Sequence, residues 1–206
     1  MLPQQEIAPL DPSLPPDTPA PIPIYTIGYG ARTMEAFIEA LKAYQINVLI
    51  DVRSAPYSRY KPEFSREELD KRLRLNGIRY VYMGDQLGGQ PADRDCYVDD
   101  KVDYDLVKEK AFYRTGIGRI RKAFQQQLRV VLMCGEGKPE ACHRSKLIGA
   151  TLKDLGIPVS HIDENDQPRT QDEIVYELTD GQLSLFGEPA FTSRKRYHAA
   201  GDDDDA

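Results

Sequence analysis

The sequence is poor in cysteine and contains no long hydrophobic run. Its 206 residues include three cysteines, an odd and scattered set, so we expect reduced thiols rather than a disulfide framework. No stretch approaches the roughly 20 apolar residues of a membrane span, and no basic segment precedes an apolar run at the start. We therefore expect a cytoplasmic protein with no membrane partner, whose hydrophobic fraction of 40% suffices for one core.

Sequence patterns for nucleotide cofactors are also missing. Gly28 and Gly30 lack the rest of the dinucleotide fingerprint, and no phosphate-loop pattern occurs. Zinc is a lower-ranked alternative, because Cys134, Cys142, His143 and Glu136 could act as ligands but adjacent residues seldom bind one metal together. No C-x-x-C pair or second histidine at ligand spacing supports such a site. The sequence thus predicts no cofactor and no metal.

The net charge of −6 is distributed unevenly along the chain. Residues 1–22 and residues 180–206 each carry −3, which leaves the middle neutral. A neutral domain can still hold a positive cleft, whereas non-specific DNA binding normally requires a basic face. The charge therefore neither identifies nor excludes a polyanionic partner.

Composition divides the chain into three parts. Residues 1–22 form a proline-rich arm that cannot bury enough surface to fold, so we predict disorder there. Residues 23–178 are predicted to be a single α/β domain. Residues 179–206 are predicted to be a flexible tail, because its closing run of aspartates repels itself.

Short β-rich runs alternate with helical patterns in the middle part, which is typical of parallel strands joined by helices. Helices are expected after Thr33, after a Ser65–Glu68 capping box that ends at Gly77, and over Ala141–Leu155. Gly84 to about Val102 reads as a long loop, and two helical patterns after it are split near Gly116. We predict a three-layer α/β fold, flavodoxin-like or Rossmann-like, with helices on both faces of a mainly parallel sheet of about five strands: 24–28, 47–52, 78–83, 129–134 and 158–162.

Ligands of open parallel sheets bind beyond the carboxyl ends of the strands. The strand ending at Val52 is followed by a polar, cationic turn, and the strand ending at Met133 is followed by Cys134 and a loop to a helix start. These two strand ends are the predicted site. From the first turn we select Arg53, Ser54, Ser58 and Arg59 as substrate-binding residues.

The second strand end carries groups suited to catalysis. A helix N-terminus favours anions and lowers the pKa of a cysteine, so Cys142 is a candidate nucleophile with His143 as acid or base and Arg144 as an anion ligand. Glu136 is a further candidate for proton transfer. Cys134 reads equally well as a small core residue, and we rank it behind Cys142.

Several motifs occur together and in order: Tyr25-Thr26-Ile27-Gly28, Leu49 to Arg53, Pro56 to Arg59, Leu87-Gly88-Gly89, and Met133 to Glu136 followed by Cys142-His143-Arg144. As a set they resemble the family called domain of unknown function 488, over roughly residues 24–162. The resemblance implies a three-layer α/β fold and adds Gly88 and Gly89 to the substrate-binding residues. It implies no reaction, because the activity of that family is not established.

A short peptide in the tail resembles the motif by which bacterial polymerases and repair proteins bind the sliding clamp. A flexible segment could place Leu185 and Phe186 in an apolar pocket while Gln182 forms a hydrogen bond at its edge. Leu183 completes the predicted partner-binding set within residues 182–186. Alternatively, the alternation of Leu183, Leu185 and Phe186 is that of a last strand.

Together these features suggest an enzyme, a hydrolase or transferase with Cys/Glu/His chemistry, acting on an anionic substrate. The expected partner is a phosphate-bearing small molecule or a nucleic acid. The competing hypothesis is a non-catalytic module recruited to DNA replication or repair through the sliding clamp.

Overall fold

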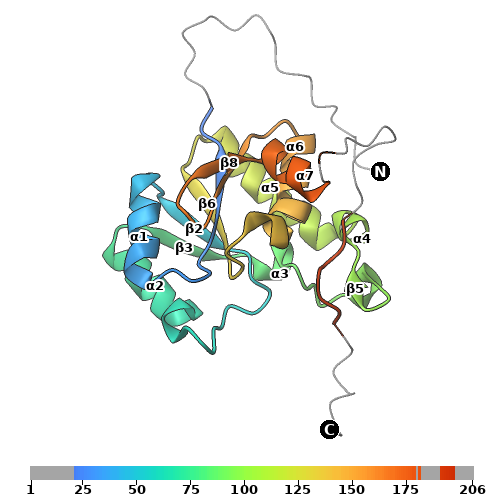
Figure 1. Ribbon diagram of the computed structural model, residues 1–206, viewed down its shortest axis with the longest axis horizontal. Helices are drawn as coiled ribbons and strands as arrows, with labels where there is room; N and C mark the ends of the chain where they lie inside the picture. The colour runs from blue at the N-terminus through green and yellow to red at the C-terminus, as the bar shows by residue number, and fades with distance from the viewer. Residues whose placement is uncertain (1–20, 180, 182–190, 198–206) are drawn as a thin grey trace, which may run out of the picture.

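The computed structural model describes residues 21–179, 181 and 191–197, and is built on a six-stranded sheet (Figure 1). The strand order is β3-β2-β6-β1-β7-β8, and all neighbours are parallel except β8, which runs antiparallel to β7. The predicted parallel α/β architecture is confirmed, with an added antiparallel edge strand. The strands are β1 (Ile24–Gly28), β2 (Val48–Asp51), β3 (Arg79–Tyr82), β6 (Val130–Cys134), β7 (Val159–Ile162) and β8 (Pro168–Thr170).

Helices cover both faces of this sheet. Along β6, Val130, Leu132 and Cys134 pack in one apolar cluster, whereas Val131 and Met133 pack in the other, because successive strand residues point to opposite faces. The first cluster lies under α4 (Tyr104–Lys108), α5 (Ala111–Gln125) and α6 (Ala150–Asp154). The second lies under α1 (Met34–Ala43) and α2 (Arg66–Leu75), which completes three layers.

The capping signals at the first two helices have different outcomes. Thr33 caps α1 as predicted, and its side chain accepts a hydrogen bond from the Ala36 N–H at 3.2 Å. Ser65 is the N-cap of α2 but makes no side-chain cap, because its hydroxyl accepts from the Ser58 N–H at 3.1 Å. The capping box predicted for Ser65 and Glu68 is therefore wrong, although α2 begins where expected.

The segment from Gly84 to Val102 contains more structure than the predicted loop. It holds α3 (Gly84–Leu87), the 3₁₀ turn η2 (Arg94–Cys96) and a hairpin of β4 (Tyr97–Val98) and β5 (Lys101–Val102). Asp99 and Asp100 form the hairpin turn with φ of 49° and 60°. This left-handed pair is the backbone that a two-residue hairpin turn requires, and aspartate tolerates it.

The expected helix break at Gly116 is also wrong. The chain breaks earlier, between α4 and α5, and α5 continues through Gly116. A Cβ on Gly116 would lie 2.7 Å from Leu87 Cδ2. Glycine is thus needed there for close packing of α5 against α3.

The helix predicted over Ala141–Leu155 is divided into three pieces. A 3₁₀ turn, η3 (Pro139–Ala141), precedes Cys142 and His143, a π-helical turn, η4 (Arg144–Gly149), follows them, and α6 comes next. Gln171, the first residue of α7 (Gln171–Leu178), donates to the Ser145 carbonyl at 3.1 Å. π-Helical turns are rare and are frequently found at functional sites, so this segment is a candidate part of the site.

Residues 191–197, hereafter the C-terminal strap, lie against the β4–β5 hairpin. The Ser193 N–H donates to the Val102 carbonyl at 2.9 Å, and the Tyr197 N–H donates to the Asp100 carbonyl at 2.7 Å. Thr192 forms an antiparallel bridge with Asp103. The strap runs beside α4 in Figure 1, where it is the dark red segment.

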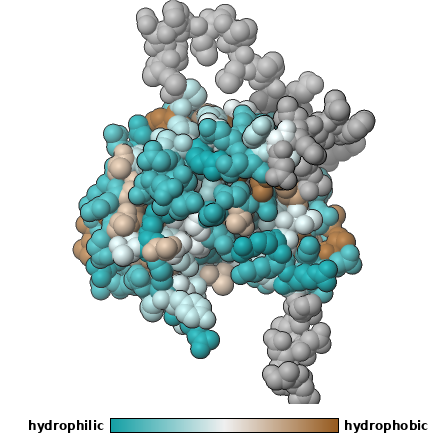
Figure 2. All heavy atoms as spheres, in the orientation of Figure 1, coloured by the Kyte–Doolittle hydropathy of each residue, from teal (hydrophilic) through white to brown (hydrophobic). Residues whose placement is uncertain are grey.

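Hydrophilic side chains dominate the face drawn in Figure 2, with apolar residues scattered among them. Within the described part of the chain, no helix is long and apolar enough to cross a membrane. The predicted proline-rich arm, apart from its last two residues, and the clamp-like peptide at 182–186 lie outside the described residues.

Candidate functional site

A cavity of about 160 Å³ opens beyond the carboxyl ends of β2 and β6. The segment after β2 leads to α2 on one face of the sheet, while the loop after β6 leads to α6 on the other. Connections that diverge in this way leave a crevice between neighbouring strand ends. The residues that line the cavity are Arg53, Ser54, Gly89, Gln90, Tyr104, Cys134, Glu136, Ala141, Cys142, His143, Ser193, Arg194, Lys195 and Tyr197.

Arg53 is fixed by a buried ion pair at the end of β2. Its Nε and Nη2 donate to the two carboxylate oxygens of Asp51 at 2.9 and 2.6 Å, and Asp51 also accepts from the Tyr80 hydroxyl at 2.8 Å. Tyr29 lies against the guanidinium, 5.4 Å from the ring centroid to Cζ. The buried Nη1 of Arg53 has no hydrogen-bond partner in the structure. Asp51 thus fixes the orientation of Arg53, which contributes positive charge to the cavity lining.

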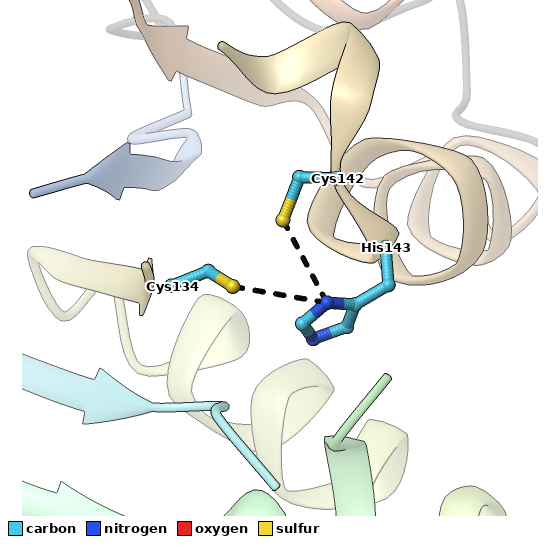
Figure 3. A group of neighbouring side chains, drawn as sticks. All are labelled: Cys134, Cys142 and His143. Atoms are coloured by element: carbon cyan, nitrogen blue, oxygen red, sulfur yellow. Dashed lines mark hydrogen bonds between the residues drawn. The ribbon is translucent and has the colours of Figure 1, made fainter. Parts of the chain in front are cut away.

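Two sulfur atoms and one imidazole meet on the opposite wall (Figure 3). His143 Nδ1 lies 3.9 Å from Cys134 Sγ and 3.6 Å from Cys142 Sγ. His143 Nε2 lies 3.1 Å from the Val52 carbonyl oxygen, which can only accept, so Nε2 carries a proton. Nδ1 therefore faces the sulfurs.

The pKa values of the two thiols are shifted in opposite directions. A hydrogen bond from the Cys142 thiol holds the pKa of Cys134 well below its ordinary value, and His143 and the Glu136 N–H contribute in the same direction. Burial raises the pKa of Cys142 well above its ordinary value. Of the two thiols, Cys134 therefore has the lower pKa, although the sequence ranked it second.

Gly88 packs on Ser54, and Gly89 packs on His143. A Cβ on Gly88 would lie 2.5 Å from Ser54 Oγ, and a Cβ on Gly89 would lie 2.7 Å from His143 Nδ1. Ser54 Oγ in turn accepts from the Gln90 N–H at 2.8 Å. The absence of side chains at both glycines allows this loop to approach the sulfur–imidazole cluster.

Arg144 is entirely buried and does not line the cavity. Its Nη2 donates to the Gly137 carbonyl at 2.7 Å, whereas its Nε and Nη1 have no hydrogen-bond partner among the described residues. A Cβ on Gly28 would lie 2.5 Å from Nη1, so the guanidinium occupies the space beside the end of β1. In this position Arg144 supports the loop that carries Glu136.

The C-terminal strap supplies residues that the sequence did not predict for the site. Arg194 and Lys195 line the cavity, and Arg194 lies 3.4 Å from the Glu136 carboxylate. Ser193 anchors the strap, since its hydroxyl accepts from the Val102 N–H at 2.9 Å and donates to the Lys195 carbonyl at 2.7 Å. The run Arg194-Lys195-Arg196 was the available signal, but only its pairing with β5 brings it here.

The structure gathers part of the predicted site in one place. Cys142, His143, Glu136, Arg53, Ser54 and Gly89 line the cavity, and Gly88 lies just behind Ser54. Ser58 and Arg59 do not line it; Ser58 is buried and accepts from the Lys61 N–H at 3.2 Å, and Arg59 is exposed. The predicted clamp-binding residues, Gln182, Leu183, Leu185 and Phe186, lie outside the described residues.

The fold and the cavity define a parallel-sheet α/β protein with a strand-end site. A family model matches residues 33–151, more than half of the chain, and its description is Domain of unknown function DUF488. The chain belongs to this family, as the motifs indicated. The comparisons with curated proteins and with solved structures each return no significant match.

Proposed function

We propose that this chain is an enzyme, a hydrolase or transferase, that acts on a phosphate-bearing anionic substrate in the strand-end cavity. The substrate class includes nucleotides and nucleic acids. The observation that carries the proposal is one cavity lined both by cations and by the Cys134, Cys142 and His143 cluster. The cations would bind the anionic substrate, and the cluster would supply the reactive groups. An enzyme of this class needs both in one cavity.

Anion binding is assigned to Arg53, Arg194 and Lys195. Asp51 fixes one edge of the Arg53 guanidinium, and the positive charge of Arg53 lies in the cavity lining, where it would attract a phosphate group. Arg194 and Lys195 are more exposed and add charge at the mouth of the cavity. Arg144 does not contact the substrate in this proposal. Its hydrogen bond to the Gly137 carbonyl positions the loop that carries Glu136.

The chemical groups are the sulfur–imidazole cluster and Glu136. Glu136 is partly buried and lines the cavity, so its carboxylate can accept a proton from an attacking group. The cavity volume is well below the roughly 300–1,000 Å³ of a site for a whole drug-sized ligand. The proposal is therefore that the phosphate group enters the cavity while the rest of the substrate lies on the surface.

The first experiment is a calorimetric titration of the full chain with inorganic phosphate, para-nitrophenyl phosphate and nucleoside monophosphates. Replacing Arg194 and Lys195 together by alanine should weaken binding at least about tenfold, which corresponds to about 1.4 kcal/mol. Turnover of the compound that binds should be lost in Cys134→Ala, and a variant that turns over normally contradicts the enzymatic part.

The matched control removes two positive charges elsewhere. Arg79 and Arg196 are exposed and do not line the cavity, so Arg79→Ala with Arg196→Ala should leave affinity unchanged apart from a small long-range effect. Equal weakening in the two double variants would contradict a specific anion site.

A second proposal concerns recruitment to replication or repair complexes. It is supported by the clamp-like residues Gln182, Leu183, Leu185 and Phe186, which fall in the chain between α7 and the C-terminal strap. Purified bacterial sliding clamp should capture the intact chain but not Leu185→Ala with Phe186→Ala. Equal capture of the two proteins would remove the clamp from consideration.

A further inference from the structure

The cluster of Cys134, Cys142 and His143 has the composition of a metal site. One ligand atom from each residue lies within 4.8 Å of the other two, and all three residues are buried. Thiolate and imidazole are the ligands that Zn²⁺ prefers in proteins. The question is whether their arrangement suits one ion.

The backbone brings the adjacent Cys142 and His143 to the same side. Cys142 is extended, with φ −120° and ψ 149°, whereas His143 is helical, with φ −62° and ψ −21°. This change of conformation turns consecutive side chains toward Cys134 at the end of β6 (Figure 3). The sequence argument against a shared metal, that neighbours seldom converge, therefore does not hold for this pair.

The two nitrogen–sulfur distances match the edges of a tetrahedral zinc site. Bonds of about 2.3 Å to sulfur and about 2.0 Å to nitrogen place a sulfur and a nitrogen ligand about 3.6 Å apart. The two distances from His143 Nδ1 to the sulfurs are 3.6 and 3.9 Å. Little movement is needed to bring all three atoms around one ion.

His143 is also held as metal-binding histidines are. Its Nε2 donates to the Val52 carbonyl at 3.1 Å, which fixes the ring with Nδ1 directed toward the two sulfurs. Gly89 packs against the ring on the same side as Nδ1. The orientation of the ligand is thus set by the main chain of two other segments.

We propose that Cys134, Cys142 and His143 bind one Zn²⁺ ion, with the fourth coordination position open to the strand-end cavity. This rests on the proposed function for its substrate: the fourth ligand is a water or an oxygen of the phosphate-bearing anion. Two thiolates and a neutral imidazole balance the charge of the ion, so the site needs no further carboxylate. Three protein ligands and an open position are the arrangement of catalytic rather than structural zinc.

The test is a cobalt titration of the full, reduced chain after removal of metal by a chelator. Tetrahedral Co²⁺ with thiolate ligands absorbs in the visible and near-ultraviolet, and we expect one equivalent per chain, displaced by Zn²⁺. Cys134→Ala and Cys142→Ala should each weaken binding at least about tenfold. Cys96→Ala is the matched control, because Cys96 is also a buried free thiol and is not part of the cluster.

The absence of thiolate–cobalt absorption in the wild-type chain would overturn the proposal, as would an equal loss in Cys96→Ala. X-ray absorption at the zinc edge of the wild-type protein needs no variant and should show two sulfurs and one nitrogen. A chain that binds phosphate but neither metal would refute the zinc site and leave the proposed anion-binding function standing. A chain that binds cobalt but no phosphate-bearing compound would support the metal site and refute the proposed anion-binding function.

Discussion

At the scale of single residues, the contact between Gly89 and His143 governs the shape of the site. A Cβ on Gly89 would lie 2.7 Å from the Cγ and Nδ1 atoms of the ring, so Gly89→Ala must push the ring or the loop aside. We expect a loss of about 1–3 kcal/mol in the free energy of unfolding, measured with urea, and weaker ligand binding.

Gly118→Ala is the control for the same substitution away from the site. Gly118 is exposed inside α5 and a Cβ there meets nothing within 4 Å. Alanine should raise the free energy of unfolding by about 0.5–1 kcal/mol, because it favours the helix more than glycine does. A gain in stability from both substitutions would contradict the close approach at Gly89.

His161 should make stability depend on pH. Burial lowers its pKa to about 4, and the charges of Arg144 and Arg169 act in the same direction, while its hydrogen bond with Gln171 opposes them. The unfolded chain, with an ordinary pKa of about 6.5, then binds a proton that the folded chain does not. The free energy of unfolding should fall as the pH drops from about 6.5 to about 4, by up to about 3 kcal/mol.

The comparison for this prediction is His161→Gln, which removes the titrating group. Urea denaturation across the same pH range should show a shallower decline for the variant than for the wild-type chain. Identical slopes would mean that His161 does not titrate differently in the two states.

The rule that ligands bind beyond the carboxyl ends of parallel strands predicted the positions of the site residues but not the directions of their side chains. It placed Arg53, Cys142 and His143 at a common edge, where the structure finds them. It could not foresee that Arg144 turns inward beside Gly28, because that depends on a space created by a distant glycine. It also ranked Cys134 low, since Cys142 and His143, two of the groups that lower its pKa, lie eight and nine residues away in sequence.

At the scale of elements, two similar motifs should respond differently to the same change. Thr170 and Glu173 form a reciprocal capping box at α7, and the Glu173 carboxylate accepts from the Thr170 N–H at 2.6 Å. Glu68 only pairs with neighbours on the surface of α2. Glu173→Ala should cost about 1 kcal/mol, whereas Glu68→Ala should change stability by less than about 0.5 kcal/mol.

Chemical denaturation of the two variants and the wild-type chain measures both values. An equal cost would mean that the capping geometry at α7 adds nothing beyond an exposed ion pair. The contrast shows why a motif alone misled the sequence argument at Ser65. The Ser65 hydroxyl has a competing donor, the Ser58 N–H, that no local pattern reveals.

Most elements were predictable because their signals are local. The strands of the parallel sheet are short apolar runs, and Gly77 and Gly156 end their helices with φ of 73° and 68°. The π-helical turn at 144–149 was not predictable, since its sequence also suits an α-helix. The continuation of α5 through Gly116 depends on Leu87, which comes from another element.

At the scale of the whole molecule, the site is assembled from segments far apart in the chain. The C-terminal strap lies beyond the matched family region of 33–151, yet it lines the same cavity. Ser193 ties the strap to β5, so Ser193→Ala should cost about 1 kcal/mol of stability and weaken phosphate binding. Calorimetry that shows unchanged affinity would separate the strap from the function of the cavity.

The location of a bound oxyanion would show whether the strand-end cavity is the anion-binding site. A crystal structure of the full chain with tungstate, a heavy analogue of phosphate, would locate the anion by its anomalous scattering. We expect a peak inside the strand-end cavity, beside Arg53, Arg194 and Lys195. Tungstate bound at Ser58 and Arg59 or elsewhere on the surface, with none in the cavity, would contradict it.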